Sequence, residues 1–223
     1  MKSLINKLHK SKVLGSIIHT LDYCLQKELE NCETALDLGC GPSSPLQYCK
    51  NIKYSVGVEA FPPYLEKSIS KKIHTKYISK KIEELDFPKD SFDAVIMIEV
   101  LEHLPEKTGY EILKKIELWA KKKIIVSSPN GFIAQKEVDG NPLQKHLSGW
   151  DVDKMKSLGF RSRGLAGLKA LRQEVQNDTM GDDLLNSIRY RPKVFWFLFT
   201  TLSQIIVYYY PKLAFGLFNV KEK

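Results

Sequence analysis

Three side chains that could bind a metal ion or transfer a proton lie within five residues of one another. They are Glu99, Glu102 and His103, in the stretch IEVLEHLP (98–105). In a helical turn, residues three and four apart share a face, so the two carboxylates and the imidazole would converge. Two carboxylates held that close repel each other unless one is protonated or a cation bridges them. Carboxylate oxygens with an imidazole suit a divalent metal such as Mg²⁺, Mn²⁺ or Fe²⁺.

The turn that carries these residues is expected to be short. Pro105 disfavours helical geometry at the residue before it, so 99–103 forms at most one turn before the next helix. HLSGW (146–150) supplies a fourth candidate ligand, His146, on the same edge of the predicted sheet. Without a metal, His103 or His146 could act as a general base near neutral pH. Both histidines are therefore candidate catalytic residues.

The elements that position these residues alternate between strands and helices. We expect strands at 34–38, 54–60, 76–79, 91–100 and 123–131, with helices at 62–70 and 108–122. The fourth strand is apolar nearly throughout, as in a strand that is covered on both faces. This alternation predicts an α/β fold with a Rossmann-like, doubly wound, mostly parallel sheet and helices on both faces. The last strand is expected to be antiparallel.

Both flanks of this core are assigned to the same domain, which we expect to span 1–223. It comprises an N-terminal helical cover (1–32), a cofactor-binding core (33–131), and a substrate-side and C-terminal cap with the last strands (132–223). The apolar spacing of the first thirty residues predicts one amphipathic helix. The apolar segment 194–210 is predicted as a buried helix between the last two strands. A lid over an apolar acceptor and a membrane-surface helix are its functional alternatives.

The first strand ends in a glycine-rich turn, LDLGCG (36–41). Gly39 and Gly41 permit a sharp turn and a close approach to a ligand, and ligands of open α/β sheets bind at the carboxyl ends of strands. A dinucleotide site would need GxGxxG, whereas this turn has only GxG, preceded by Asp37. That carboxylate disfavours a phosphate and suits an amine or a sulfonium. Glu59, at the end of the second strand, could accept hydrogen bonds from both hydroxyls of a ribose.

Here the sequence resembles the class I S-adenosylmethionine-dependent methyltransferases of the type 11/12 kind. The resemblance runs from about Thr34 to Phe160, through LDLGCG, VGVEA, LDFPKDSFDAVIMIEVLEHL and IIVSSPN in the order and spacing of that family. It implies S-adenosylmethionine as cofactor and a methyl-transfer reaction. The cofactor-binding residues that it implies are Asp37, Gly39, Cys40, Gly41, Glu59, Ala60, Ile82, Glu83 and Glu99. Lys81 stands where family members often carry an acid near the adenine, so Glu83, Glu84 or a backbone amide would have to substitute.

The Glu-x-x-Glu-His turn is similar to that of two metal-assisted groups, the small-RNA terminal 2′-O-methyltransferases and the O-methyltransferases of ubiquinone synthesis. By that resemblance a divalent metal, Mg²⁺ or Mn²⁺, holds the acceptor hydroxyl and lowers its pKa. Its ligands would be Glu99, Glu102, His103 and His146. A Glu-His-Leu turn also occurs in class I methyltransferases that use no metal, in which the first acid lines the methionine pocket. Both interpretations remain open at this point.

The acceptor is expected to be a hydroxyl of a small or lipid-linked metabolite. RNA is the alternative acceptor, since 34 Lys and Arg against 26 Asp and Glu give a net charge of +8, although no RRM-type motif occurs. A third interpretation is a non-catalytic, cofactor-binding partner subunit. Contact with a membrane periphery and a homodimer are further open alternatives.

The expected location is the cytoplasm. Four lysines interrupt the apolar pattern of the N-terminus, so we expect no signal peptide: Lys2, Lys7, Lys10 and Lys12. The four cysteines form no CxxC pair, which favours reduced thiols.

Overall fold

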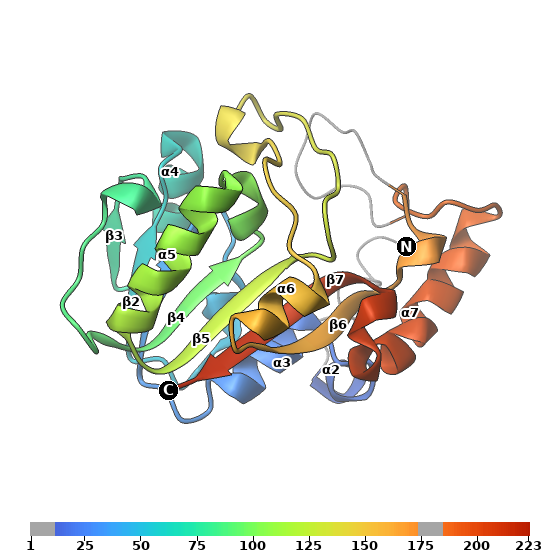
Figure 1. The fold of residues 1–223 in the computed structure, drawn as a ribbon, viewed down its shortest axis with the longest axis horizontal. Coiled ribbons are helices and arrows are strands. Elements are labelled where there is room, and N and C mark those ends of the chain that lie inside the picture. The colour runs from blue at the N-terminus through green and yellow to red at the C-terminus, as the bar shows by residue number, and fades with distance from the viewer. Residues whose placement is uncertain (1–11, 174–184) are drawn as a thin grey trace.

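A seven-stranded sheet in the order β3-β2-β1-β4-β5-β7-β6 forms the centre of the protein (Figure 1). The computed structural model describes residues 12–173 and 185–223. The parallel strands are β1 (Thr34–Leu38), β2 (Tyr54–Val58), β3 (Lys76–Ile78), β4 (Phe92–Ile98) and β5 (Ala120–Pro129). β7 (Ala214–Glu222) runs antiparallel to β5 and to β6 (Arg161–Leu168). The predicted mostly parallel, doubly wound sheet with an antiparallel last strand is confirmed.

The strand order reverses at β1, which lies between β2 and β4. In the register of the sheet, Leu38 at the end of β1 pairs with Val58 of β2 and Met97 of β4. The chain segments that follow these three strands therefore meet on one edge of the sheet, at the position where open α/β sheets bind ligands. They contain Gly39, Glu59 and Glu99.

Helices cover both faces of the sheet. α5 (Glu106–Trp119) and α6 (Val152–Ser157) pack on one face, where most of the buried apolar side chains gather. α3 (Leu21–Glu28) packs on the opposite face. α2 (Lys12–Ile18) contacts α3 and α7 (Lys193–Tyr209), and α7 packs on β6 at the edge of the sheet (Figure 1). α4 (Pro62–Ser70) connects β2 to β3.

The N-terminal cover is two helices and not one. Between α2 and α3, His19 has a φ of 52°, which lies outside the right-handed helical region. Thr20 then caps α3 by accepting a hydrogen bond from the backbone N–H of Tyr23. The prediction of one continuous helix is therefore wrong for the described part, and its portion over 1–11 lies outside the described residues.

The C-terminal apolar segment forms α7, between β6 and β7 in the chain as predicted. The prediction that it is buried holds for one side only, because several large apolar side chains on its other side are exposed. Within 12–173 and 185–223, no helix is long and apolar enough to cross a membrane.

Candidate functional site

A cleft of about 1020 Å³ opens at the carboxyl ends of β1, β2 and β4. All nine residues that the resemblance assigns to the cofactor line it: Asp37, Gly39, Cys40, Gly41, Glu59, Ala60, Ile82, Glu83 and Glu99. Glu102, His103 and His146 line the same cleft. The fold thus brings the predicted cofactor, catalytic and metal residues into a single site.

One part of the cleft, which we call the cofactor cradle, consists of Asp37, Gly39, Gly41 and Glu59. Gly39 and Gly41 have φ values of 67° and 55°, in the left-handed region that glycine adopts most readily. A Cβ atom at Gly39 would lie 2.6 Å from the side chain of Val100, so the packing of the neighbouring loop requires glycine there. A Cβ atom at Gly41 would meet no atom nearer than 4.0 Å, so this backbone faces the open cleft.

Glu59 is held in place by backbone donors. One of its carboxylate oxygens accepts the N–H of Gly41 at 3.0 Å, and the other accepts the N–H of Phe61 at 2.8 Å. Burial raises the pKa of Glu59, while these N–H groups act in the opposite direction. A carboxylate can accept several hydrogen bonds, so this group suits a ligand that presents two hydroxyls.

Asp37 is almost fully buried and contacts two polar side chains. Its Oδ2 accepts a hydrogen bond from the Ser44 hydroxyl at 2.5 Å and lies 3.4 Å from Nε2 of His74. Burial raises the pKa of Asp37 to about 7 and lowers the pKa of His74 to about 4. Burial in the cradle therefore favours the uncharged form of both groups, and a ligand ammonium group would favour the Asp37 carboxylate. With the open backbone at Gly41 and the acceptors of Glu59, the cradle fits the amino-acid and ribose parts of S-adenosylmethionine.

Two further features concern the edges of the cradle. Sγ of Cys40 lies 3.9 Å from the Ser68 hydroxyl. Burial raises the pKa of the Cys40 thiol, so it is an unreactive packing group.

On the adenine side, Ile82 and Glu83 line the cleft together with Lys81. Of the two acids considered as substitutes near the adenine, Glu83 is the one that borders the cleft.

The helical turn after β4 is shorter than predicted. It covers only Leu101–His103, and Glu99 before it has a φ of 55°, which is uncommon for a residue with a side chain. The N–H of Glu99 donates to the Ser127 carbonyl at 2.9 Å, and its carboxylate accepts a hydrogen bond from the Ser127 hydroxyl. The prediction of one helical turn that aligns Glu99 with Glu102 is therefore wrong. Desolvation by the surrounding protein raises the pKa of Glu99. Its side chain is nevertheless exposed to the open cleft.

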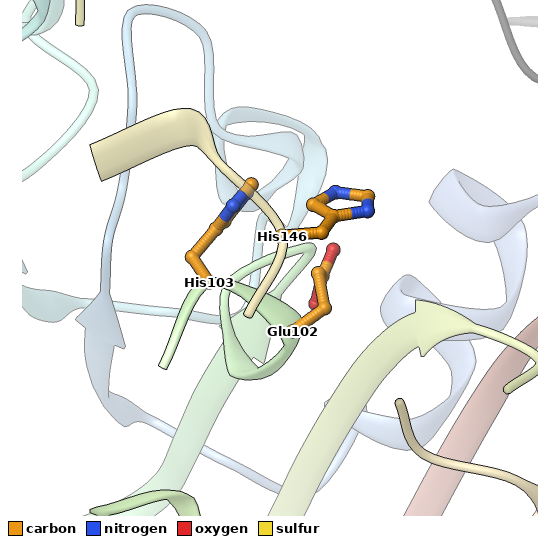
Figure 2. Close-up of side chains that lie close together, drawn as sticks. All are labelled: Glu102, His103 and His146. Carbon is orange, nitrogen blue, oxygen red and sulfur yellow. The ribbon is translucent and has the colours of Figure 1, made fainter. Parts of the chain in front are cut away.

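The remaining three residues form a compact group, the Glu–His–His cluster (Glu102, His103 and His146). One possible ligand atom from each lies within 4.8 Å of the other two. In Figure 2 the Glu102 carboxylate points toward the His146 ring, with the His103 ring beside them. Nδ1 of His146 lies 2.6 Å from the Ile133 carbonyl, and Nδ1 of His103 lies 3.3 Å from the Lys145 carbonyl. Because a carbonyl can only accept, these contacts assign the proton to Nδ1 and the lone pair to Nε2, the tautomer that suits a metal ligand or a base.

Glu102 is a buried carboxyl that the protein does not fully satisfy. Its side-chain oxygen Oε2 has no hydrogen-bond partner among the described residues. Burial raises the pKa of Glu102 well above its ordinary value, and the nearby Glu99 raises it further. Burial and the neighbouring His146 lower the pKa of His103 to about 4. At neutral pH the cluster therefore presents at least one uncharged imidazole, that of His103, beside the buried carboxyl group of Glu102.

Hydrogen bonds from a distant loop position His146. The backbone N–H groups of Leu147 and Ser148 both donate to the Glu102 carbonyl, at 2.8 and 3.1 Å. The indole N–H of Trp150 donates to the Ser148 hydroxyl at 2.8 Å, and the Trp150 side chain is completely buried. A Cβ atom at Gly109 of α5 would lie 2.5 Å from that indole, so glycine there is needed to admit it. Trp150 therefore anchors the loop that presents His146.

Sequence reasoning missed four side chains that line or support the cleft: Ser44, His74, Ser127 and Arg172. Ser44 follows the glycine turn directly, so its place in the sequence could have identified it. No spacing signal identifies His74 or Ser127, because His74 reaches Asp37 from the bend before β3 and strand pairing brings Ser127 to Glu99. Arg172 is buried at the other end of the cleft, where it donates to the Ala166 carbonyl and the Ser187 hydroxyl.

Comparisons with known proteins agree with this fold. Residues 36–123 match the methyltransferase domain family. Among solved structures, the methyltransferase domain of bacterial CtHen1-CN superposes with a TM-score of 0.56 at 16% identity, covering 93% of this chain and 100% of that chain. A SAM-dependent methyltransferase from Archaeoglobus fulgidus gives a TM-score of 0.53 at 16% identity, covering 95% and 98%.

A weaker match relates the chain to the PH0226 protein from Pyrococcus horikoshii, with a TM-score of 0.45 at 23% identity. It covers 54% of this chain and 60% of that one, so the chain spans less than two thirds of that protein. A search of curated proteins finds no match. At these identities the structural matches establish the fold alone, and the match over 36–123 identifies a methyltransferase domain in that part of the chain. Over residues 36–123 the chain therefore resembles the class I S-adenosylmethionine-dependent methyltransferases.

Proposed function

We propose that the protein transfers the methyl group of S-adenosylmethionine to a hydroxyl of a small or lipid-linked metabolite, with a divalent cation held by the Glu–His–His cluster. The observation that carries this proposal is the unsatisfied oxygen of Glu102 beside two imidazoles with their lone pairs on Nε2. An oxygen and two nitrogens at this spacing suit Mg²⁺ or Mn²⁺.

The residues divide the task between the two parts of the cleft. The cradle orients the cofactor, whose sulfonium supplies the methyl group. A divalent cation in the cluster would supply positive charge that lowers the pKa of an acceptor hydroxyl. Glu102 would become a carboxylate in that state. A histidine that gives its Nε2 lone pair to the cation cannot also accept a proton, so the acceptor's proton would pass to water at the open cleft. Most of the rate enhancement then comes from holding the nucleophile in line with the methyl group and excluding water.

The lining of the cleft supports a metabolite or lipid-linked acceptor. Near the Glu–His–His cluster the loop after β5 contributes several apolar side chains to the cleft: Ile133, Val138, Leu143 and Leu147. Leu143 and Leu147 are themselves substantially exposed, so an apolar acceptor would cover them. RNA recognition would instead call for stacking platforms beside a cationic groove.

The test is methyl transfer from labelled S-adenosylmethionine into an extract of a strain that lacks the gene. The extract is separated into organic-soluble, small water-soluble and RNA fractions, after exhaustive chelation and after Mg²⁺ or Mn²⁺ is added back. We expect label in one of the first two fractions, only with the cation present, and fragmentation should place it on oxygen.

Glu102→Gln should abolish this transfer while S-adenosylhomocysteine still binds. Its matched control is Glu111→Gln, which removes an exposed carboxyl on α5. Label in RNA would replace the proposed acceptor with the alternative one. Transfer that survives chelation would remove the cation from the proposal.

A further inference from the structure

α7 has the reverse of the usual amphipathic arrangement. Every residue of α7 with an exposed side chain is apolar or aromatic, and we call this set the outer face of α7: Val194, Phe195, Leu198, Phe199, Leu202, Ile205, Ile206 and Tyr209. Leu198 and Leu202 are 59% and 63% exposed. The inner side carries Thr200, Ser203 and Gln204, all buried. Scattered exposed apolar residues are ordinary, but a continuous stripe along a whole helix marks an interaction surface.

The orientation of α7 is fixed by its inner side. Gln204 accepts the N–H of Gly167 and donates to the Gly164 carbonyl, both at 2.9 Å. Ser203 accepts the N–H of Leu168 at 3.0 Å. A Cβ atom at Gly164 would lie 2.1 Å from the carbonyl oxygen of Val207, so the helix backbone sits directly on β6. Because rolling the helix would break these buried hydrogen bonds, the apolar stripe cannot turn inward.

Positively charged residues flank both ends of the outer face of α7. Arg189, Arg191 and Lys193 precede or begin the helix, and Lys212 follows it. The sequence from 185 to 221 contains no aspartate or glutamate. Arg189, Arg191 and Lys212 are exposed, and tyrosines lie at both ends of the outer face, Tyr190 and Tyr210, 43% and 64% exposed. Aromatic side chains with polar tips and flanking cations favour the boundary between lipid headgroups and acyl chains.

We propose that the outer face of α7 docks the protein on an anionic lipid bilayer. The apolar side chains would enter the acyl boundary, and the flanking cations would meet lipid phosphates. A helix of 17 residues lying in the surface plane gives a contact about 25 Å long. The docking itself does not depend on the proposed function.

Charge favours a bilayer over a second copy of this chain. A two-fold symmetric pair that joined two outer faces antiparallel would bring Arg191 and Lys193 of one copy toward Lys212 of the other. A parallel pair would bring the same cations together. Like charges across an interface oppose association, whereas lipid phosphates neutralise them.

The inner side of α7 packs beside one end of the cleft. In the irregular part of β6, Ala166 lines the cleft, while a Cβ atom at the next residue, Gly167, would lie 2.4 Å from the Thr200 carbonyl of α7. Docking on α7 would therefore hold this end of the cleft close to the lipid surface. If the acceptor is lipid-linked, as the proposed function allows, it could enter without leaving the bilayer.

The experiment is co-sedimentation of the full chain with vesicles of phosphatidylcholine, alone or with one third phosphatidylglycerol (about 0.3 mole fraction, to give a negative surface potential). The disrupting variant is Leu198→Glu with Leu202→Glu. The matched control is Ile69→Glu with Leu118→Glu, which changes two exposed apolar residues on α4 and α5 and adds the same charge. Unchanged S-adenosylhomocysteine binding shows that each variant is folded.

We expect wild type and control to sediment with anionic vesicles, at least about tenfold more tightly than with neutral ones, and less so as salt increases. The α7 variant should remain in the supernatant. The proposal is overturned if wild type does not sediment, or if the control loses binding equally. It is also overturned if wild type is a dimer that the α7 variant converts to a monomer while vesicles bind neither, because the occupant is then a second copy.

Discussion

The two parts of the cleft are built in opposite ways. In the cofactor cradle, backbone turns and N–H groups hold the side chains, so Glu59 is satisfied by Gly41 and Phe61 before any ligand arrives. In the Glu–His–His cluster, Glu102 keeps an oxygen without a partner among the described residues, and Nδ1 of each histidine contacts a backbone carbonyl. The cradle is therefore preorganised for a ligand, whereas the cluster keeps an acceptor oxygen, Oε2 of Glu102, that its described neighbours do not pair.

The two parts also depend on different structural elements. Three parallel strands that end at one edge suffice to form the cradle. The cluster needs a loop from after β5, carried by Trp150 and by two hydrogen bonds to the Glu102 carbonyl. Changes to the cradle should therefore abolish cofactor binding, and changes to the cluster should leave it intact.

The largest expected effect is at Gly41. Gly41→Leu would place a side chain in the open cleft, where we expect the cofactor to approach the protein backbone. Affinity for S-adenosylhomocysteine should therefore fall at least about a hundredfold. Gly140→Leu is the matched control, because its φ of 68° imposes the same backbone strain and a Cβ atom there meets no neighbour. Calorimetry on both folded variants makes the comparison.

Equal losses in the two variants would contradict the assignment, since strain alone would then explain the effect. Gly39 is a poorer position for this test. A side chain there would collide with Val100 and disturb the protein itself.

The next effect is on the pH dependence of cofactor binding. Burial raises the pKa of Asp37 to about 7, so below pH 7 the protein must release a proton before the carboxylate can bind the ligand's ammonium group. Affinity for S-adenosylhomocysteine should be nearly constant above pH 7.5 and fall by about tenfold per pH unit well below 7. His74, with a pKa of about 4, stays neutral throughout this range and cannot cause the change.

Calorimetry between about pH 6 and 8 measures this slope. Asp37→Asn should bind weakly and show no pH dependence over the same range. A flat profile for wild type would mean that Asp37 does not meet the ligand's charge.

The smallest expected effect is on stability without ligands. Because the pKa of Glu102 is raised in the folded protein, the folded state holds this proton more tightly than the unfolded state does. Stability therefore falls as pH rises above the ordinary pKa of glutamate. Glu102→Gln cannot ionise, so at pH 8 it should unfold at a temperature a few degrees above wild type, with the gap shrinking toward pH 5. A melting temperature below that of wild type at pH 8 would show that the carboxylate is already stabilised.

The sequence predicts the cradle well because its determinants are local. TALDL became β1 at its predicted bounds, and the apolar 92–98 run is the central strand β4. The glycine turn and the acid after β2 depend only on parallel strands ending together. Fold and cradle thus follow from short motifs and their order along the chain.

The parts that sequence could not predict depend on distant contacts or unusual backbone. Hydrogen bonds to Ser127 stabilise the left-handed conformation of Glu99, so a spacing rule based on helices misplaced its carboxylate. Gln204 and Ser203 bind β6, and this turns the apolar side of α7 outward against the usual rule for amphipathic helices. Hydrophobic periodicity alone could not reveal either arrangement.

Direct measurement of cation binding tests the central claim, which is that the Glu–His–His cluster binds a divalent metal ion. Protein freed of metal by chelation and saturated with S-adenosylhomocysteine is titrated with Mn²⁺ in a calorimeter, alongside Glu102→Gln and the control Glu111→Gln. The account predicts one bound Mn²⁺ per chain for wild type and Glu111→Gln, and none for Glu102→Gln, with cofactor affinity equal in all three. Absence of Mn²⁺ binding to wild type, or equal binding to Glu102→Gln, would contradict it and leave these three residues as hydrogen-bonding groups of the cleft.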